Sequence, residues 1–147
     1  MTTTNEIIRE GTANKFKMNP RINSISLPTN DLDRAYTFYK EGLGLPTRGI
    51  KKGKENHASF KLGNGLQLVV YDRKDLFDKE ALANTINHGR GFIISHNADS
   101  REEVDIILQK ALDAGARKLG ETSNEPWRYA VCFSDPDGHQ WEIAWEA

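Results

Sequence analysis

The sequence is poor in the features that mark several classes of protein. It contains a single cysteine, Cys132, among 147 residues, which excludes an internal disulfide and any zinc site built from several cysteines. It has no apolar run near the roughly 20 residues that a membrane-spanning helix needs. Its first residues, MTTTNEIIREG, lack the apolar core of a secretory signal. We therefore expect a cytoplasmic protein without a membrane partner, and we expect Cys132 to be a core thiol.

The chain also lacks an excess of charge of one sign. It has 20 Lys and Arg against 21 Asp and Glu, with a formal net charge of −1. The basic residues are scattered along the sequence and do not line one predicted face. This distribution argues against nucleic acid as a partner. The length suits one domain with a sizeable core.

One pattern of elements occurs twice, at an offset of about 70 residues. Each copy begins with a short strand, continues with a capped amphipathic helix that ends at glycine, and finishes with three short strands separated by turn residues. The first helix is expected to start after Asn30 or Asp31, and the second after Ser100. The expected strands are 21–27, 47–52, 57–62 and 66–72 in the first copy, and a segment from 91, then 118–121, 128–133 and 139–146, in the second.

This repeat predicts an α+β fold made of two βαβββ modules. The expected organisation is an N-terminal arm at 1–20, a first module at 21–73, a linker at 74–90 and a second module at 91–147, all within one structural domain. The polar first 20 residues leave open a role in binding another protein.

Strand parity assigns each side chain to one of two faces of its sheet. In the last strand Trp141, Ile143 and Trp145 share an apolar face that must pack on helices, so Glu142 points to the opposite, concave face. If DPDG (135–138) is a four-residue hairpin loop, Val131 pairs with Glu142. The residues expected on the concave face, and therefore predicted to bind a ligand, are Ser24, Ser26, Gln67, Val69, Tyr129 and Val131.

Two further side chains at the entry to strand 128–133 are candidates for the rim of that face. Trp127 follows a proline and could cover the mouth of a cavity, although core packing explains it equally well. Arg128 is a candidate to pair with an anionic group of a ligand. His139, after the DPDG turn, is expected to satisfy turn carbonyls.

The segments ISLPTNDLDRAYTFYKEGLGL, LGNGLQLVVYD and YAVCFSDPDGHQWEIAWE together resemble the vicinal-oxygen-chelate superfamily. This superfamily includes glyoxalase I, extradiol dioxygenases, fosfomycin-resistance enzymes and bleomycin-resistance binding proteins. The resemblance covers residues 21–147. It implies that the two modules form a cupped, eight-stranded mixed sheet around a cavity, with helices on the convex face. It also implies a homodimer.

The metal enzymes of that superfamily place a ligand on the first and the last strand of each module. Position by position, the resemblance puts Ser24, Gln67, Ile93 and Glu142 at those sites. Glu142 matches the usual ligand and Gln67 offers an amide oxygen, but Ile93 cannot bind a metal. His96 does not replace Ile93, because a shift of three residues reverses the face. We expect no metal; if Zn, Ni, Mn or Fe binds, Glu142 and Gln67 would hold it.

The resulting hypothesis is a glyoxalase/bleomycin-resistance-fold protein. Its cup binds a small, partly apolar organic molecule, with Glu142 as a hydrogen-bond acceptor or cation partner. The alternative is an enzyme of the same superfamily, a lyase, isomerase or dioxygenase, that uses a divalent metal or Glu142 itself as catalytic base. The sequence leaves open whether the protein is an enzyme.

Overall fold

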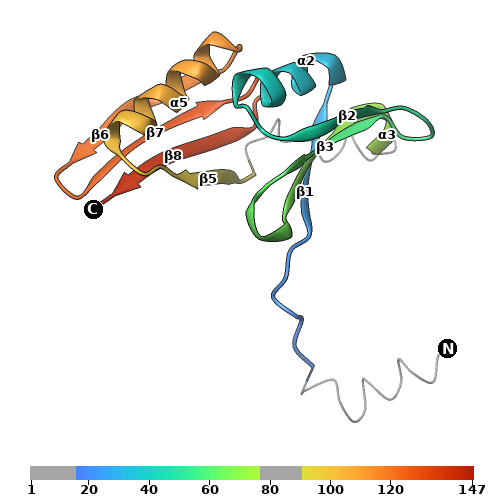
Figure 1. Cartoon of the computed structure of the whole chain (residues 1–147), viewed down its shortest axis with the longest axis horizontal. Helices are drawn as coiled ribbons and strands as arrows, with labels where there is room; N and C mark the ends of the chain where they lie inside the picture. The colour runs from blue at the N-terminus through green and yellow to red at the C-terminus, as the bar shows by residue number, and fades with distance from the viewer. Residues whose placement is uncertain (1–15, 77–90) are drawn as a thin grey trace.

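Two modules of similar design make up the chain, as the repeat predicts. The computed structural model describes residues 16–76 and 91–147 (Figure 1). Most of the predicted arm, residues 1–15, and of the predicted linker, residues 77–90, lies outside the described residues. The first module contains β1 (Ser24–Thr29), α2 (Leu32–Thr37), the π-helical turn η2 (Phe38–Gly42), β2 (Thr47–Lys51), β3 (His57–Lys61), the 3₁₀ turn η3 (Gly63–Gly65), β4 (Gln67–Asp72) and α3 (Arg73–Leu76). The second contains β5 (Ile93–Asn97), α5 (Arg101–Asp113), β6 (Arg117–Glu125), β7 (Arg128–Ser134) and β8 (Gln140–Glu146).

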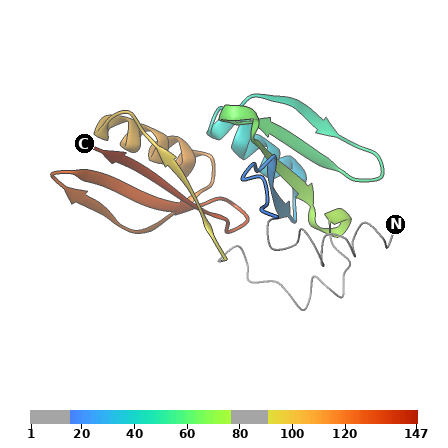
Figure 2. The same cartoon turned by 90° about the horizontal axis from the view of Figure 1, so that it is seen from below.

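Each module forms its own four-stranded mixed sheet. The strand orders are β1-β4-β3-β2 and β5-β8-β7-β6, and in each sheet the first strand runs parallel to the last while the other pairs are antiparallel. The edge strands β1 and β5 lie toward the middle of the molecule (Figures 1 and 2). The α+β fold is confirmed, and the eight strands belong to two sheets that are not closed into one.

Both main helices start at the side-chain caps that the sequence offers. The Asp31 carboxylate accepts a hydrogen bond from the Arg34 backbone N–H at 3.1 Å, so Asp31 and not Asn30 caps α2. The Ser100 hydroxyl accepts one from the Glu103 N–H at 3.1 Å, as predicted for α5. Each cap satisfies a backbone donor that would otherwise have no partner in the first turn of the helix.

The apolar core lies between the sheets and the helices and runs across both modules. Helices α2 and α5 both lie toward the upper side in Figure 1. The rings of Tyr39 and Trp141, one from each module, are 6.0 Å apart between centroids, and those of Phe38 and Phe133 are 6.5 Å apart. No helix among the described residues is long and apolar enough to cross a membrane. Buried core residues include Leu27, Phe38, Tyr39, Phe60, Leu68, Val104, Phe133, Trp141 and Ile143.

The end of η2 meets the end of α5 at very short range. A Cβ added at Gly42 would lie 2.5 Å from the Cβ of Ala114, closer than real Cβ atoms approach. Only a residue without a side chain fits at position 42 in this packing. The glycine that stops the first helical segment therefore also allows the two modules to touch.

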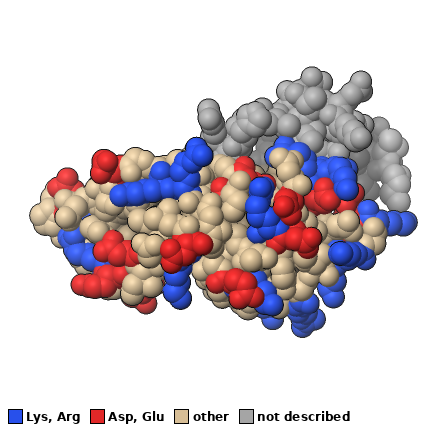
Figure 3. Space-filling view, turned by 90° about the horizontal axis from the view of Figure 1, so that it is seen from above, with Lys and Arg blue, Asp and Glu red and all other residues tan. Residues whose placement is uncertain are grey.

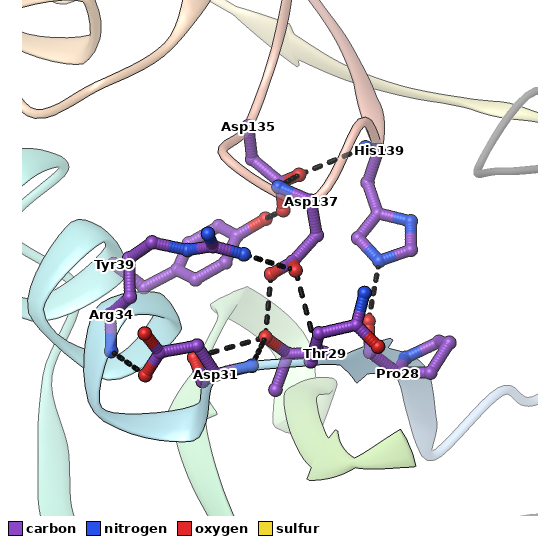
Figure 4. Close-up of polar contacts among 9 residues, drawn as sticks. Pro28, Thr29, Asp31, Arg34, Tyr39, Asp135, Asp137 and His139 are labelled. Carbon is purple, nitrogen blue, oxygen red and sulfur yellow. Dashed lines mark hydrogen bonds and ion pairs between the residues drawn. The ribbon is translucent and has the colours of Figure 1, made fainter.

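Polar contacts of the DPDG turn join the modules as well (Figure 4). Asp137 accepts a hydrogen bond from the Thr29 hydroxyl at 2.7 Å and pairs with Arg34 at 2.7 Å. His139 reaches the Pro28 carbonyl oxygen with Nε2 at 2.8 Å. A carbonyl only accepts, so Nε2 carries the proton. His139 does bind a carbonyl, as predicted, but that carbonyl belongs to the other module.

Asp135 is the buried centre of this junction, with 4% of its surface exposed. Its Oδ1 accepts the backbone N–H groups of Asp137 and His139 at 2.9 and 2.8 Å, and its Oδ2 accepts the Tyr39 hydroxyl at 2.5 Å. The same Tyr39 oxygen accepts the Trp141 indole N–H at 3.2 Å. Burial raises the pKa of Asp135, against the opposing effects of His139 and of the Tyr39 hydrogen bond.

Candidate functional site

Each sheet has one face packed on a helix and one face turned away from it, here called its open face. On the first sheet, Ser24 pairs with Gln67 and Ser26 with Val69. Their neighbours Leu27, Leu68 and Val70 are buried on the helix side. All four first-module residues that the sequence predicted to share the concave face therefore share the open face. Ser24, Ser26 and Gln67 are exposed there, and Val69 is 6% exposed.

The open face of the second sheet carries Glu142 in a defined polar setting. Its Oε1 accepts a hydrogen bond from the Ser95 hydroxyl at 3.2 Å, and its Oε2 pairs with the Arg128 guanidinium at 3.1 Å. Arg128 also contacts Glu146 through Nε at 3.1 Å. Hydrogen bonds to Glu142 and then to Glu146 raise the pKa of Arg128. Arg128 is predicted as a partner for a ligand's anionic group, and in the structure it pairs with the carboxylates of Glu142 and Glu146.

The hairpin before β8 is one residue shorter than the sequence analysis assumed. The Asp135 N–H bonds the His139 carbonyl at 2.8 Å, so the loop proper is the three residues 136–138. Gly138 supplies the positive φ, 92°, that a three-residue loop requires at its last position. Cys132, not Val131, consequently pairs with Glu142. A slip of one residue exchanges the faces of a whole strand.

This register corrects two predicted ligand-binding residues. Val131 pairs with Ile143 and is 2% exposed. Tyr129 turns to α5, where its hydroxyl donates to Asp105 at 2.7 Å. Both lie on the helix face, so the prediction that Tyr129 and Val131 line the face of Glu142 is wrong. Trp127 lies in the turn between β6 and β7 with 63% of its surface exposed.

Ser95 and Cys132 are the open-face residues that the sequence analysis missed. Ser95 pairs with Glu142, whereas Ile93 pairs with Gln140, so the first-strand neighbour of Glu142 is Ser95 and not Ile93. Cys132 is partly exposed beside Glu142 instead of lying in the core. Burial, and secondly the charge of Glu142, raise the pKa of its thiol. The parity of β5 places His96 with Ile143 on the helix side, as predicted.

The residues present do not fit the divalent ion that metal enzymes with this fold hold. Both oxygens of Glu142 already have protein partners, and its first-strand neighbour is a serine hydroxyl. Within residues 16–76 and 91–147, no three His, Cys, Asp or Glu side chains lie together so that they could hold a metal. Neutral hydroxyl and amide groups are weak ligands for the transition metals concerned.

A pocket of about 540 Å³ lies on the open face of the first sheet. The structure places Gln67 in its wall, but Glu142 is not among the residues that line it. Gln67 and Glu142, predicted to share a site, therefore contribute to separate parts of the surface in a single chain. Polar residues in the wall of the pocket are Thr47, Arg48, Lys51, His57, Ser59, Lys61 and Gln67.

Comparison with known proteins identifies the family. The sequence profile of the Glyoxalase/Bleomycin resistance protein/Dioxygenase superfamily matches residues 21–143, which include the first module and most of the second, with Glu142. The chain belongs to this superfamily. The resemblance seen in the DPDG and NDL segments is thus confirmed over residues 21–143.

Solved structures of superfamily members share the fold at low sequence identity. A glyoxalase-related enzyme from Fulvimarina pelagi is 24% identical, with a TM-score of 0.73 and coverage of 87% of this chain and 89% of that one. A glyoxalase/bleomycin resistance protein/dioxygenase from Nocardioides is 22% identical, with a TM-score of 0.68 and coverage of 98% and 93%. A lactoylglutathione lyase from Agrobacterium tumefaciens is 24% identical, with a TM-score of 0.62 and coverage of 87% and 95%. At these identities the likeness concerns the fold and not the activity.

Proposed function

We propose that the open faces of the two sheets bind a small, partly apolar organic molecule, and that they do so without a metal centre. The observation that carries this proposal is the state of Glu142, which Arg128 and Ser95 hold in one orientation on a partly exposed surface. A carboxylate fixed in this way is a ready hydrogen-bond acceptor for a ligand N–H or O–H. The energetic cost of orienting it is met before the ligand arrives.

The first sheet offers the remaining properties that a small-molecule site needs. Its pocket of about 540 Å³ is within the range of ligand sites, roughly 300–1,000 Å³. The ring of His57, in the pocket wall, lies 5.3 Å between centroids from the ring of Tyr71 at a tilt of 30°, and the two rings offer contacts to an apolar or aromatic group. Ser24, Ser26 and Gln67 add neutral donors and acceptors nearby.

A screen of small aromatic and aliphatic compounds by ¹⁵N NMR tests the proposal. A compound that binds should shift the resonances of open-face residues such as Ser95 and Cys132. Glu142→Gln should weaken it about tenfold, the value of one hydrogen bond to a charged group. Glu102→Gln removes an exposed carboxylate in the first turn of α5 and should leave the affinity unchanged. If no compound shifts the open faces, or if both variants bind as the wild type does, the proposal fails.

We further propose that the protein acts as a cytoplasmic homodimer. Phe92 and Ile93 are 50% and 53% exposed at the edge strand β5, and a second copy would remove this apolar surface from water. Ile93→Lys should then convert a dimer into a monomer in analytical ultracentrifugation, while Lys118→Gln should not. A wild-type chain that sediments as a monomer at all concentrations would refute this assembly.

A further inference from the structure

The pocket of the first module is positively charged to a degree that the sequence does not suggest. Arg48, Lys51 and Lys61 come from β2 and β3 and all contribute to its wall. Within residues 16–76 and 91–147, no aspartate or glutamate lines it. Among the described residues, none of the three cations forms an ion pair. The whole chain has a formal net charge of −1, but positive charge is concentrated at this pocket.

The face of the molecule that carries the helices has charges of both signs. The face on which α2 and α5 lie shows red and blue side chains interspersed (Figure 3). Some basic groups elsewhere are paired with carboxylates, as Arg34 is with Asp137 and Arg128 is with Glu142 and Glu146. Unpaired cations around a hollow raise the local potential, since the low-dielectric walls focus the field.

Strand geometry explains how the cations reach one pocket. Lys51 pairs with His57 across β2 and β3, and Lys61 pairs with Gln67 across β3 and β4. The register of β2 shifts between Thr47 and Ile50. Gly49, inside this shift, has a φ of 102°, which is the backbone of a bulge that changes the direction of neighbouring side chains. Arg48 therefore joins the pocket that Lys51 lines, although strict alternation would place the two on opposite faces.

Neutral donors complete the set. Ser59 lies between His57 and Lys61 on the same strand face, and its hydroxyl can donate a hydrogen bond. The Nδ1 atom of His57 lies 3.3 Å from the Glu55 carbonyl oxygen. When Nδ1 of the neutral ring donates to that carbonyl, Nε2 carries no proton and can accept a hydrogen bond from a ligand O–H. The three cations and the Ser59 hydroxyl around the hollow match the oxygen atoms of a phosphate or carboxylate.

We propose that this pocket binds the anionic end of the ligand, a phosphate or carboxylate group on a small organic molecule. The inference rests on the proposed function and adds the chemical class of the ligand. The concave pocket, with Ser59 and Gln67 in its wall, favours a small molecule over an extended polyanion, which would need a long basic track. The His57 and Tyr71 rings lie next to the cations and would contact the apolar part of the ligand.

Phenyl phosphate, benzoate and phenol form a panel that separates charge from the aromatic ring. In ¹⁵N NMR titrations, phenyl phosphate and benzoate should shift the resonances of Ser59, Lys61 and Gln67 and bind at least tenfold more tightly than phenol. Raising NaCl from 0.05 to 0.5 M should weaken the anions and leave phenol unchanged, because salt screens exposed charges.

Substitutions of single lysines test whether the pocket is where phenyl phosphate binds. Lys51→Gln and Lys61→Gln should each weaken phenyl phosphate about three- to tenfold. Lys118→Gln, which removes an exposed lysine on β6, should leave its affinity unchanged. All three side chains are exposed, so circular dichroism should show the same fold in each variant.

The outcomes distinguish this inference from the proposed function. If phenol or another neutral compound binds the open faces as tightly as the anions do, the anionic class is wrong and the proposed function stands. Equal weakening by Lys118→Gln would show general attraction to the surface and would also overturn the inference. If neither anions nor neutral compounds bind the open faces, both proposals fail. A single-stranded oligonucleotide should bind no more tightly than phenyl phosphate. Tighter binding of the oligonucleotide would show that the pocket takes its phosphate group from a nucleic acid, and it would overturn the inference of a small-molecule ligand.

Discussion

Removal of the Tyr39 hydroxyl tests how strongly the two modules depend on each other. Tyr39 belongs to the first module and is completely buried. Its hydroxyl donates to Asp135 at 2.5 Å and accepts from the Trp141 indole at 3.2 Å, and both partners belong to the second module. Tyr39→Phe therefore deletes one bond to a buried carboxylate and leaves one buried N–H without an acceptor.

The magnitude follows from these two losses. A hydrogen bond to a charged group contributes about 1.5–3 kcal/mol, and a buried donor left without a partner costs about 1–3 kcal/mol. Together we expect the free energy of unfolding to fall by about 3–5 kcal/mol, measured as a lower urea midpoint at unchanged slope. For a chain of this size the melting temperature should fall by roughly 10 °C. Tyr36→Phe removes a hydroxyl from a half-buried ring on the preceding helix and should cost less than about 0.5 kcal/mol.

The loss should also depend on pH. Burial raises the pKa of Asp135 in the folded chain, so ionising it costs stability as pH rises from its unfolded value, about 3.9, through its folded value. The Tyr39 hydroxyl lowers that pKa. Without it the penalty for ionisation grows, and Tyr39→Phe should be more destabilising at pH 7 than at pH 4. Equal losses at both pH values, or equal losses for Tyr39→Phe and Tyr36→Phe, would refute the role assigned to this hydroxyl.

Two further predictions concern the open face and the contact between modules. Burial and the charge of Glu142 raise the pKa of Cys132, while Arg128 lowers it; the pH midpoint of iodoacetamide alkylation should therefore move down in Glu142→Gln and up in Arg128→Gln. Gly42→Ala places a Cβ 2.5 Å from that of Ala114 and should lower the free energy of unfolding by about 1–3 kcal/mol through overpacking, measured in urea.

Each of these predictions has its own control. Gly53→Ala adds a Cβ that meets nothing within 4 Å, and equal losses at positions 42 and 53 would show that the effect comes from the backbone and not from the module contact. For the thiol, Glu102→Gln removes a carboxylate from α5 and should leave the alkylation midpoint of Cys132 in place. If Glu142→Gln moves the midpoint upward, the charge assignment at Cys132 is wrong.

The fold was predictable because its signals are local and repeated. Ser100 and Asp31 each cap the helix that follows them directly in the sequence. The alternation of Trp141, Ile143 and Trp145 assigns the faces of their strand without knowledge of the neighbouring strands. The position of Glu142 on the face opposite to these residues follows from parity alone. These predictions needed only the spacing of residues along one strand or helix.

The site was less predictable because it depends on pairing between strands. Whether Val131 or Cys132 lies beside Glu142 is decided by one residue in the length of a hairpin loop, and the Asp135 hydrogen bonds that close this loop form only once the turn has folded. The basic pocket depends on a bulge at Gly49 and on two strand registers. The bulge and the registers could not be predicted from the sequence, in which the basic residues are spread along the chain.

Metal content gives the most direct test of the central claim that this superfamily member binds its ligand without a metal. The purified protein and Glu142→Gln are each equilibrated with Zn²⁺, Ni²⁺, Mn²⁺ or Fe²⁺, freed of unbound ion and analysed for metal, with melting temperatures measured in parallel. We predict far less than one ion per chain, the same content in the variant, and no rise in melting temperature. One ion per chain that raises the melting temperature and is lost in Glu142→Gln would contradict the account.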